Sequence, residues 1–302
     1  MSTKKKVLIV AQLALGDSLI LKKRGIKLVE QHIDVTILCN SYNEFIFKDY
    51  KKIIEDWPIA FNRNLDFSSI FYRNLKPRFD DILIPSAHFK ELLWARLRLE
   101  NKKIIIPSGN SFKKMQKNQS KFSQYGLKKI NLKSTHWYEL YNDFFKSYAA
   151  LNGFETTYFE ESSKINVFED SIILSPYSRT RKNRAEYKFI PRTFIEDIIR
   201  FGDKHNYKIY MIDFNKNEFN KKNNHVHITS KEAYTKIRNN KFTFGFFCDS
   251  FMSHLFYKQI KNHYVYITKE DIFHRFAVPN DLIIFDNDQK YFQDFIMENS
   301  TQ

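Results

Sequence analysis

The chain has 302 residues, 43% of them apolar and 17% aromatic, and carries a formal net charge of +15. The high apolar content excludes a disordered chain, and the length suits two domains of ordinary size. No uninterrupted apolar run reaches roughly 18 residues, which excludes a conventional membrane-spanning helix.

The amino terminus bears on the compartment of the protein. Three lysines, Lys4 to Lys6, precede the apolar segment 7–15 and so imitate a secretory signal peptide. Gln12 interrupts that segment and Asp17 follows it, so we predict a buried first strand and a cytoplasmic protein. The two cysteines, Cys39 and Cys248, lack the paired spacing of a zinc site, and we expect buried free thiols rather than a disulfide.

The first half of the chain alternates short apolar runs with longer segments whose apolar residues recur at helical spacing. Such runs are typical of strands buried on both faces of a parallel sheet. The predicted strands are 7–13, 34–40, 81–85 and 103–107, and the predicted helices are 18–31, 44–55, 89–100 and 136–151. For the basic, polar stretch 111–134 we predict a loop or flap and no strand.

After a polar linker at 152–164 the alternation begins again. The predicted strands are 171–175, 208–214, 226–229, 242–248, 264–267 and 282–285, and the predicted helices are 192–205, 231–238, 250–260 and 290–297. The pattern predicts an α/β protein of two Rossmann-like parallel-sheet domains, 1–160 and 161–302, that face a central cleft. Ligands of such sheets bind beyond the carboxyl ends of the strands, so the turns at those ends are the candidate sites.

Phosphate binding through a glycine-rich loop is excluded. The seven glycines form neither G-x-G-x-x-G nor G-x-x-x-x-G-K-[ST]. Any phosphate site therefore has to use helix amino termini and basic side chains.

The first candidate turn, 15–18, directly follows the first strand. Gly16 permits a tight turn and Asp17 begins a helix. Two interpretations stay open for Asp17: a helix N-cap, or a general base that takes the proton of a hydroxyl group.

The second candidate turn, 175–191, is strongly basic and ends at Pro191, a residue typical of helix starts. Guanidinium groups beside a helix start suit a diphosphate, whereas the alternative is a solvated basic loop. The cations within this turn are Arg179, Arg181, Lys182, Arg184 and Lys188.

In the third candidate turn, 247–254, a strand runs directly into a helix. Asp249 or Ser250 would cap this helix, whose free N–H groups suit an anion. His254 lies one turn further on, either as a functional residue or as a packing residue.

Three short motifs occur in order along the chain. Gly16-Asp17 follows the first strand, 188–191 precedes a helix of the second half, and 249–254 begins with Asp-Ser and ends with His. In this order they resemble the motifs of bacterial ADP-heptose:lipopolysaccharide heptosyltransferases and their relatives, glycosyltransferases of the GT-B fold. The chain departs from that pattern where Ile190 replaces a Trp and Phe251 replaces a Gly.

The resemblance implies a role for each matching residue. Asp17 would be the catalytic base in an acceptor-binding domain, 1–160. The donor would bind in 161–302, with the diphosphate held by Lys188 and Ser178 and by the N–H groups of Ser250 and Phe251. The remaining donor contacts would come from Arg179 and Arg181 of the basic turn, from Asp249 and His254, and from Glu218 at the ribose.

The implied reaction is the transfer of a heptose or related sugar from a nucleotide-diphosphate donor to a glycan of lipopolysaccharide, lipooligosaccharide or capsule type. A single base suits direct displacement with inversion. Asp80-Asp81 is the one Asp-Asp pair in the sequence, a pattern that could suggest a divalent metal, and it precedes a strand, at the wrong end of the sheet. We therefore predict metal independence and no cofactor.

The excess positive charge predicts an anionic partner. Lys113, Lys114 and Lys117, with aromatic residues on either side, would contact an anionic glycan or glycolipid acceptor, or the inner leaflet of the membrane, unless they form a solvated loop. A basic nucleic-acid-binding protein is a competing class, although the sequence has no recognition-helix, zinc or RNA-binding signature. A non-catalytic GT-B-like glycan-binding protein is another.

Overall fold

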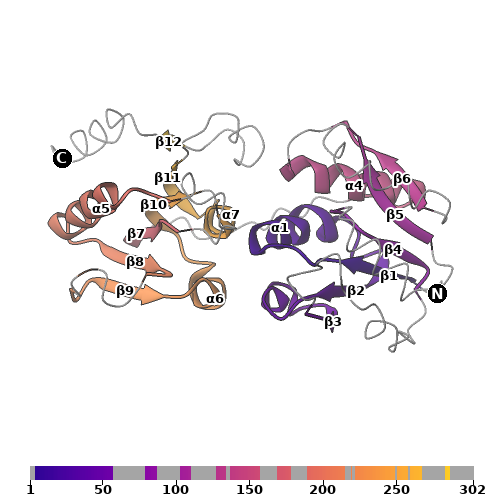
Figure 1. The fold of residues 1–302 in the computed structure, drawn as a ribbon, viewed down its shortest axis with the longest axis horizontal. Helices are drawn as coiled ribbons and strands as arrows, with labels where there is room; N and C mark the ends of the chain where they lie inside the picture. The colour runs from indigo at the N-terminus through magenta and orange to yellow at the C-terminus, as the bar shows by residue number, and fades with distance from the viewer. Residues whose placement is uncertain are drawn as a thin grey trace, which may run out of the picture. The chain divides into compact units, whose positions relative to one another are not determined.

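The computed structural model describes residues 4–56, 79–86, 103–109, 127–133, 137–156, 169–177, 189–214, 219, 222–248, 250–257, 259–266 and 283–285. The chain divides into two compact units, Met1–Glu160 and Glu161–Gln302. Each unit has its own parallel sheet with helices packed against it (Figure 1).

The sheet of the first unit has six strands in the order β3-β2-β1-β4-β5-β6, all parallel. The order reverses between β1 and β4, the Rossmann arrangement. Its central strand is almost wholly apolar, and Val7, Leu8, Ile9 and Val10 are fully buried. The strands are β1 (Lys5–Val10), β2 (Ile33–Cys39), β3 (Lys51–Ile54), β4 (Asp81–Leu83), β5 (Lys103–Ser108) and β6 (Leu127–Asn131).

One continuous helical segment follows β1 in this unit. It begins as α1 (Leu15–Ile20) and continues through η1 (Leu21–Gly25) and η2 (Ile26–Leu28). It packs against α4 (Trp137–Leu151), and a Cβ atom added at Gly25 would lie only 2.7 Å from Cδ2 of Phe145. A glycine at this position therefore permits the close approach of the two helices.

The sheet of the second unit repeats this topology in the order β12-β11-β10-β7-β8-β9, again all parallel. Here the order reverses between β7 and β10. The core is rich in stacked aromatic rings, such as Phe246 on Tyr264 at 4.9 Å between centroids. The strands are β7 (Glu169–Ser175), β8 (Lys208–Ile212), β9 (His225–Ile228), β10 (Phe242–Cys248), β11 (Ile260–Tyr266) and β12 (Ile283–Phe285).

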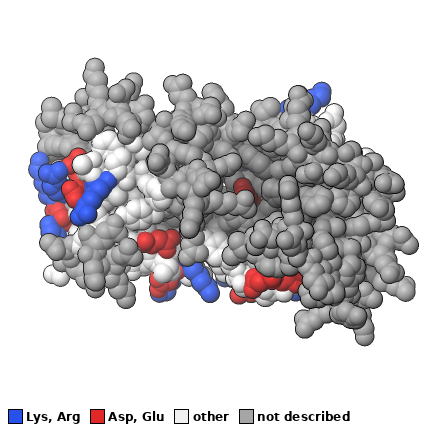
Figure 2. Space-filling view, viewed as in Figure 1, with Lys and Arg blue, Asp and Glu red and all other residues white. Residues whose placement is uncertain are grey.

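Among the described residues of the second unit, the helices are α5 (Arg192–Lys204), the short α6 (Ser230–Glu232) with η8 (Ala233–Ile237), and α7 (Phe251–Phe256). The outer face of α5 is charged: Arg192 pairs with Glu196 at 2.9 Å and Arg200 pairs with Asp197. Figure 2 shows this face at the left as intermixed blue and red side chains, which is the pattern of a solvated helix surface.

The structure confirms the α/β class and the two Rossmann-like parallel sheets, and it corrects three predicted elements. Segment 44–55 is not a helix, because a 3-10 turn (Glu44–Phe47) leads into the edge strand β3. Part of 111–134, predicted to contain no strand, forms β6, a polar edge strand with only one face buried. The helix predicted at 250–260 ends at Phe256, because β11 begins at Ile260.

Other predictions have different outcomes. Helices predicted at 89–100 and 290–297 lie outside the described residues. Cys39 and Cys248 are free and buried, as predicted. Burial raises the pKa of the Cys39 thiol to about 11, so this thiol is unreactive at neutral pH. Within the described ranges, none of the helices combines the length and apolar character that crossing a bilayer requires.

Candidate functional site

The three candidate turns lie at the carboxyl ends of β1, β7 and β10, strands at which the order of a sheet reverses. At such a point the two neighbouring connections leave toward opposite faces of the sheet and open a crevice for a ligand. The topology of each unit therefore places these turns where parallel α/β sheets bind small molecules.

Asp17 lies in the first turn of α1, just beyond β1, and is half-buried. The N-cap is Ala14, so the interpretation of Asp17 as the cap is wrong, and Gly16 lies inside the helix rather than in a tight turn. The helix begins earlier than predicted, directly after Ala14, whose backbone is extended. A carboxylate in the first turn of a helix is stabilised by the helix dipole.

The second turn leaves β7 through Ser175 and Tyr177 and returns at Phe189. Tyr177 and Phe189 form an isolated antiparallel bridge, and the N–H of Ile190 donates to the carbonyl of Pro176 at 3.1 Å. The two ends of segment 178–188 are thereby joined at the carboxyl end of β7. Pro191 is the N-cap of α5, close to its predicted place at the helix start.

Aromatic rings surround this junction. The ring of Tyr177 lies 6.0 Å from that of Phe189 and 5.4 Å from that of Phe214, and Phe214 lies 5.5 Å from Phe219. The Arg192 guanidinium lies over Phe219 at 5.8 Å. The sequence analysis did not predict this aromatic cluster (Tyr177, Phe189, Phe214 and Phe219). An aromatic residue stands on each side of segment 178–188 and of segment 215–218, and this pattern could have indicated the cluster.

In the third turn, Ser250 is the N-cap of α7. It is one of the two residues that the sequence offered as the cap. Ser253 closes it, because its hydroxyl donates to the Ser250 carbonyl at 2.7 Å. Phe251, which stands where the resembling family has glycine, is 8% exposed, with its ring 6.2 Å from that of Tyr234. The added bulk is therefore accommodated by packing within the second unit.

His254 is 8% exposed inside α7, and it interacts electrostatically with His263 of β11. Burial, with a smaller contribution from the charge of His254, lowers the pKa of His263 to about 3. The charges of the two imidazoles therefore interact.

The carboxyl ends of β8 and β9 are joined by a carboxylate that sequence reasoning did not select. Asp213, with φ at 58°, follows β8 and accepts the N–H of Ser230 at 2.9 Å, and the Ser230 hydroxyl bonds to its other oxygen. Its position directly after a strand could have indicated Asp213 in the sequence. Asp213 and Ser230 thus add polar groups to the same sheet edge as the second and third turns.

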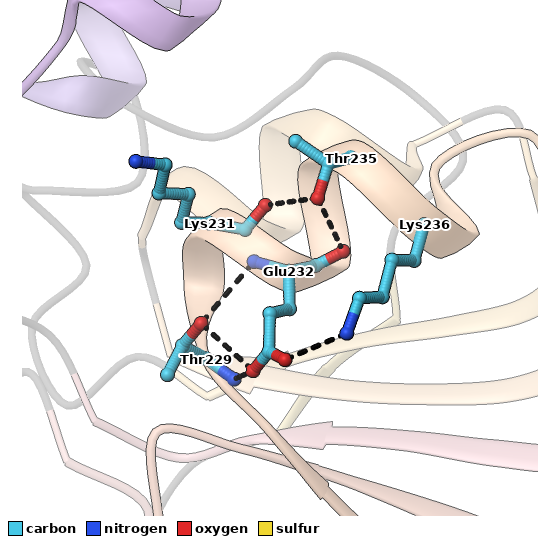
Figure 3. Close-up of polar contacts among 5 residues, drawn as sticks. All are labelled: Thr229, Lys231, Glu232, Thr235 and Lys236. Carbon is cyan, nitrogen blue, oxygen red and sulfur yellow. Dashed lines mark hydrogen bonds and ion pairs between the residues drawn. The ribbon is translucent and has the colours of Figure 1, made fainter.

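The neighbouring helix start is a complete capping box (Figure 3). The Thr229 hydroxyl accepts the N–H of Glu232 at 3.2 Å, and the Glu232 carboxylate accepts the N–H of Thr229 at 2.9 Å. Lys236 binds the other carboxylate oxygen at 2.8 Å and, with these hydrogen bonds, lowers the pKa of Glu232 to about 2. This device fixes the turn that carries Ser230.

The acidic pair Asp80-Asp81 lies at the amino-terminal end of β4, the end opposite the candidate turns. Asp81 is buried, 2.6 Å from the Lys5 ammonium, and accepts the phenol hydrogen of Tyr148 at 2.9 Å. Its oxygens are therefore used in binding α4 to the sheet. Among the described residues, no three His, Cys, Asp or Glu side chains gather to form a metal-binding group.

Four of the predicted site residues are described by the structure: Asp17 in the first unit, and Ser250, Phe251 and His254 together on α7 in the second. The others lie outside the described residues, namely Lys113, Lys114, Lys117, Ser178, Arg179, Arg181, Lys188, Glu218 and Asp249.

Comparison with known proteins gives similarity at the level of structure. No family model and no curated protein matches the chain. The E. coli heptosyltransferase WaaC with ADP-2-deoxy-2-fluoro heptose matches with a TM-score of 0.66 at 12% identity, over 97% of this chain and 99% of that one. The chain has the heptosyltransferase fold.

Two further structures with this fold support the assignment. A family 9 glycosyl transferase from Veillonella parvula matches with a TM-score of 0.63 at 12% identity, over 100% of this chain and 93% of that one. E. coli ADP-heptose lps heptosyltransferase II matches with a TM-score of 0.61 at 10% identity, over 98% of this chain and 99% of that one. The heptosyltransferase fold therefore accounts for both units of the chain.

Proposed function

We propose that this protein is an inverting, metal-independent glycosyltransferase. It moves a heptose or related sugar from a nucleotide-diphosphate donor to a glycan acceptor of lipopolysaccharide, lipooligosaccharide or capsule type. The observation that carries the proposal is the match over nearly the whole chain to a heptosyltransferase holding an ADP-heptose analogue. Because fold alone does not decide function, the proposal also depends on Asp17, a carboxylate at the carboxyl end of β1.

In the proposed reaction, the Asp17 carboxylate takes the proton of an acceptor hydroxyl. The hydroxyl oxygen forms a bond to the anomeric carbon of the donor while the bond between that carbon and the diphosphate oxygen breaks. The electron pair of the broken bond leaves with the diphosphate. One displacement on the face opposite the leaving group inverts the anomeric centre. The growing charge on the diphosphate needs fixed donors, each of which contributes a few kcal/mol in a closed site.

The second unit would supply these donors. The diphosphate would be held by Lys188, Ser178, Arg179 and Arg181 and by the N–H groups at the start of α7. Asp249 and His254 would contact the donor and Glu218 the ribose. The described parts of this edge, the joined ends of 178–188 and the α7 start at Ser250, support this assignment.

The first unit would bind the acceptor. Lys113, Lys114 and Lys117 would contact an anionic glycan or glycolipid, in line with the net charge of +15. The same charge would hold the protein at the cytoplasmic face of the inner membrane.

The test is a thermal-shift screen with ADP, UDP and GDP and their sugars, ADP-heptose included, followed by calorimetry and transfer assays with deacylated lipopolysaccharide cores. A donor present at 100 times its Kd raises stability by about 2.7 kcal/mol. Lys188→Ala should weaken donor binding, whereas Lys204→Ala, the same change at the exposed end of α5, should not. No shift with any nucleotide, or transfer that requires a divalent metal, would contradict the proposal.

A further inference from the structure

Asn43 is a fully buried amide beneath the turn that carries Asp17. Its side chain is 0% exposed, although asparagine is seldom completely enclosed. Asn43 lies in the connection after β2, the neighbour of β1 in the sheet. A buried amide is costly unless its hydrogen bonds are made, so its partners indicate what it does.

The amide nitrogen of Asn43 reaches three acceptors on the β1–α1 segment. It lies 2.8 Å from the Ala11 carbonyl, 3.2 Å from the Leu13 carbonyl and 2.8 Å from the Ser18 hydroxyl. Ala11 and Leu13 belong to the segment between β1 and α1, and Ser18 is buried in α1, next to Asp17 in the chain. One side chain thus binds both the incoming chain and the helix start.

The amide is itself held in place by Asn40. The amide oxygen of Asn43 accepts the N–H of Asn40 at 3.0 Å, and the Asn40 amide oxygen accepts the N–H of Asn43 at 2.9 Å. These reciprocal bonds close the turn after β2 and fix the side chain of Asn43. A network in which every group is bonded permits one geometry and resists small displacements.

We propose that Asn43 is the positioning residue for Asp17. This inference rests on the proposed function, in which Asp17 is the base. Asn43 acts through the backbone of the β1–α1 turn and through Ser18, and so fixes the place from which the Asp17 carboxylate reaches the acceptor hydroxyl. A displacement of about 1 Å can cost about 100-fold in rate, so such a restraint affects turnover directly.

The first experiment compares Asn43→Ala and Ser18→Ala with wild type, using the donor and acceptor identified in the screen. We expect Asn43→Ala to lower kcat about 10- to 100-fold with the nucleoside diphosphate Kd unchanged, because the donor binds to the other unit. Ser18→Ala removes one acceptor and leaves the amide its two carbonyls, so a drop of about three- to tenfold is expected. Ser18→Ala also keeps the test open if Asn43→Ala does not fold.

Asn152→Ala is the matched control, because Asn152 binds the opposite, amino-terminal end of β1. Its amide oxygen accepts from the Lys5 ammonium at 2.8 Å and its amide nitrogen donates to the Tyr148 carbonyl at 2.8 Å. This variant should lower the melting temperature without changing kcat. An equal loss of kcat in Asn152→Ala and Asn43→Ala would overturn the inference, since the effect would then be one of general stability.

A double-mutant cycle gives the deciding result. If Asn43 acts through Asp17, then Asn43→Ala lowers kcat in the wild-type background but has almost no further effect in the Asp17→Asn background. Independent, multiplying effects would overturn the inference while leaving Asp17 as the base. An Asp17→Asn variant with unchanged turnover would instead remove Asp17 from the proposed mechanism, so the two failures are distinguishable.

Discussion

Tyr177 and Phe189 pair across the two ends of segment 178–188, with their ring centroids 6.0 Å apart. The same Tyr177 ring meets Phe214, which precedes segment 215–218. Both segments contain residues proposed to bind the donor, Lys188 in the first and Glu218 in the second. Tyr177 therefore connects the flanks of two segments that are proposed to bind the donor.

Replacing Tyr177 by leucine should weaken donor binding more than stability alone explains. The change removes two ring contacts, each contributing about 0.5–1.5 kcal/mol. Tyr207 is the matched control, because it is equally half-buried on the same core but lies at the amino-terminal end of β8. Both variants should lower the melting temperature, and only Tyr177→Leu should raise the calorimetric Kd for the nucleotide sugar. Equal Kd values in the two variants would contradict this role.

Asp17→Asn should reduce turnover by about 10²–10⁴-fold, the contribution of a general base, and leave nucleotide affinity unchanged. The side chain keeps its size and its place in the first turn of α1, so the fold is preserved. Asp34→Asn, which breaks an exposed ion pair with Lys51, serves as the control with normal turnover. Steady-state kinetics at saturating donor decides between the loss of a catalytic base and the loss of a carboxylate that only stabilises the first turn of α1.

The central strands could be predicted from sequence, because β1 and β10 are buried on both faces and therefore almost continuously apolar. Two edge strands of the first unit could not: β3 and β6 are partly exposed, so their polar residues hide the pattern. In the candidate site, the positions of Asp17 and Ser250 could be predicted, because each residue follows closely on a buried strand in the sequence. Asn43 could not be selected, because its role depends on contacts with residues about 30 positions away, which no local pattern records.

Asp81→Asn should destabilise the first unit and leave the chemistry unchanged. The variant removes a buried carboxylate that binds Lys5 and Tyr148 and that raises the pKa of the Tyr148 phenol beyond the effect of burial. We expect a loss of about 2–3 kcal/mol, less than for a fully enclosed pair because Lys5 keeps access to water. Tryptophan fluorescence in urea measures it, since Trp57, Trp94 and Trp137 all belong to the first unit. We also expect the folded Asp81→Asn variant to have the kcat of the wild-type protein.

The second unit should lose stability as the pH falls from about 6.5 toward 3. Burial lowers the pKa of His263 to about 3, whereas an unfolded histidine titrates near 6.5. Between these values the unfolded chain binds a proton that the folded chain does not, so the free energy of unfolding falls by up to about 1.4 kcal/mol per pH unit. Above pH 6.5 this contribution is fully present.

His263→Phe isolates this effect, because the new ring keeps the packing against Phe247, whose ring lies 4.8 Å from that of the imidazole. Urea unfolding followed by circular dichroism at several pH values between 4.5 and 7.5 should show a shallower loss of stability in the variant. The two proteins should differ most at the lowest pH and converge above pH 6.5. Parallel curves for wild type and variant would mean that the pKa of His263 is the same in the folded and the unfolded protein, so that burial does not keep the imidazole neutral.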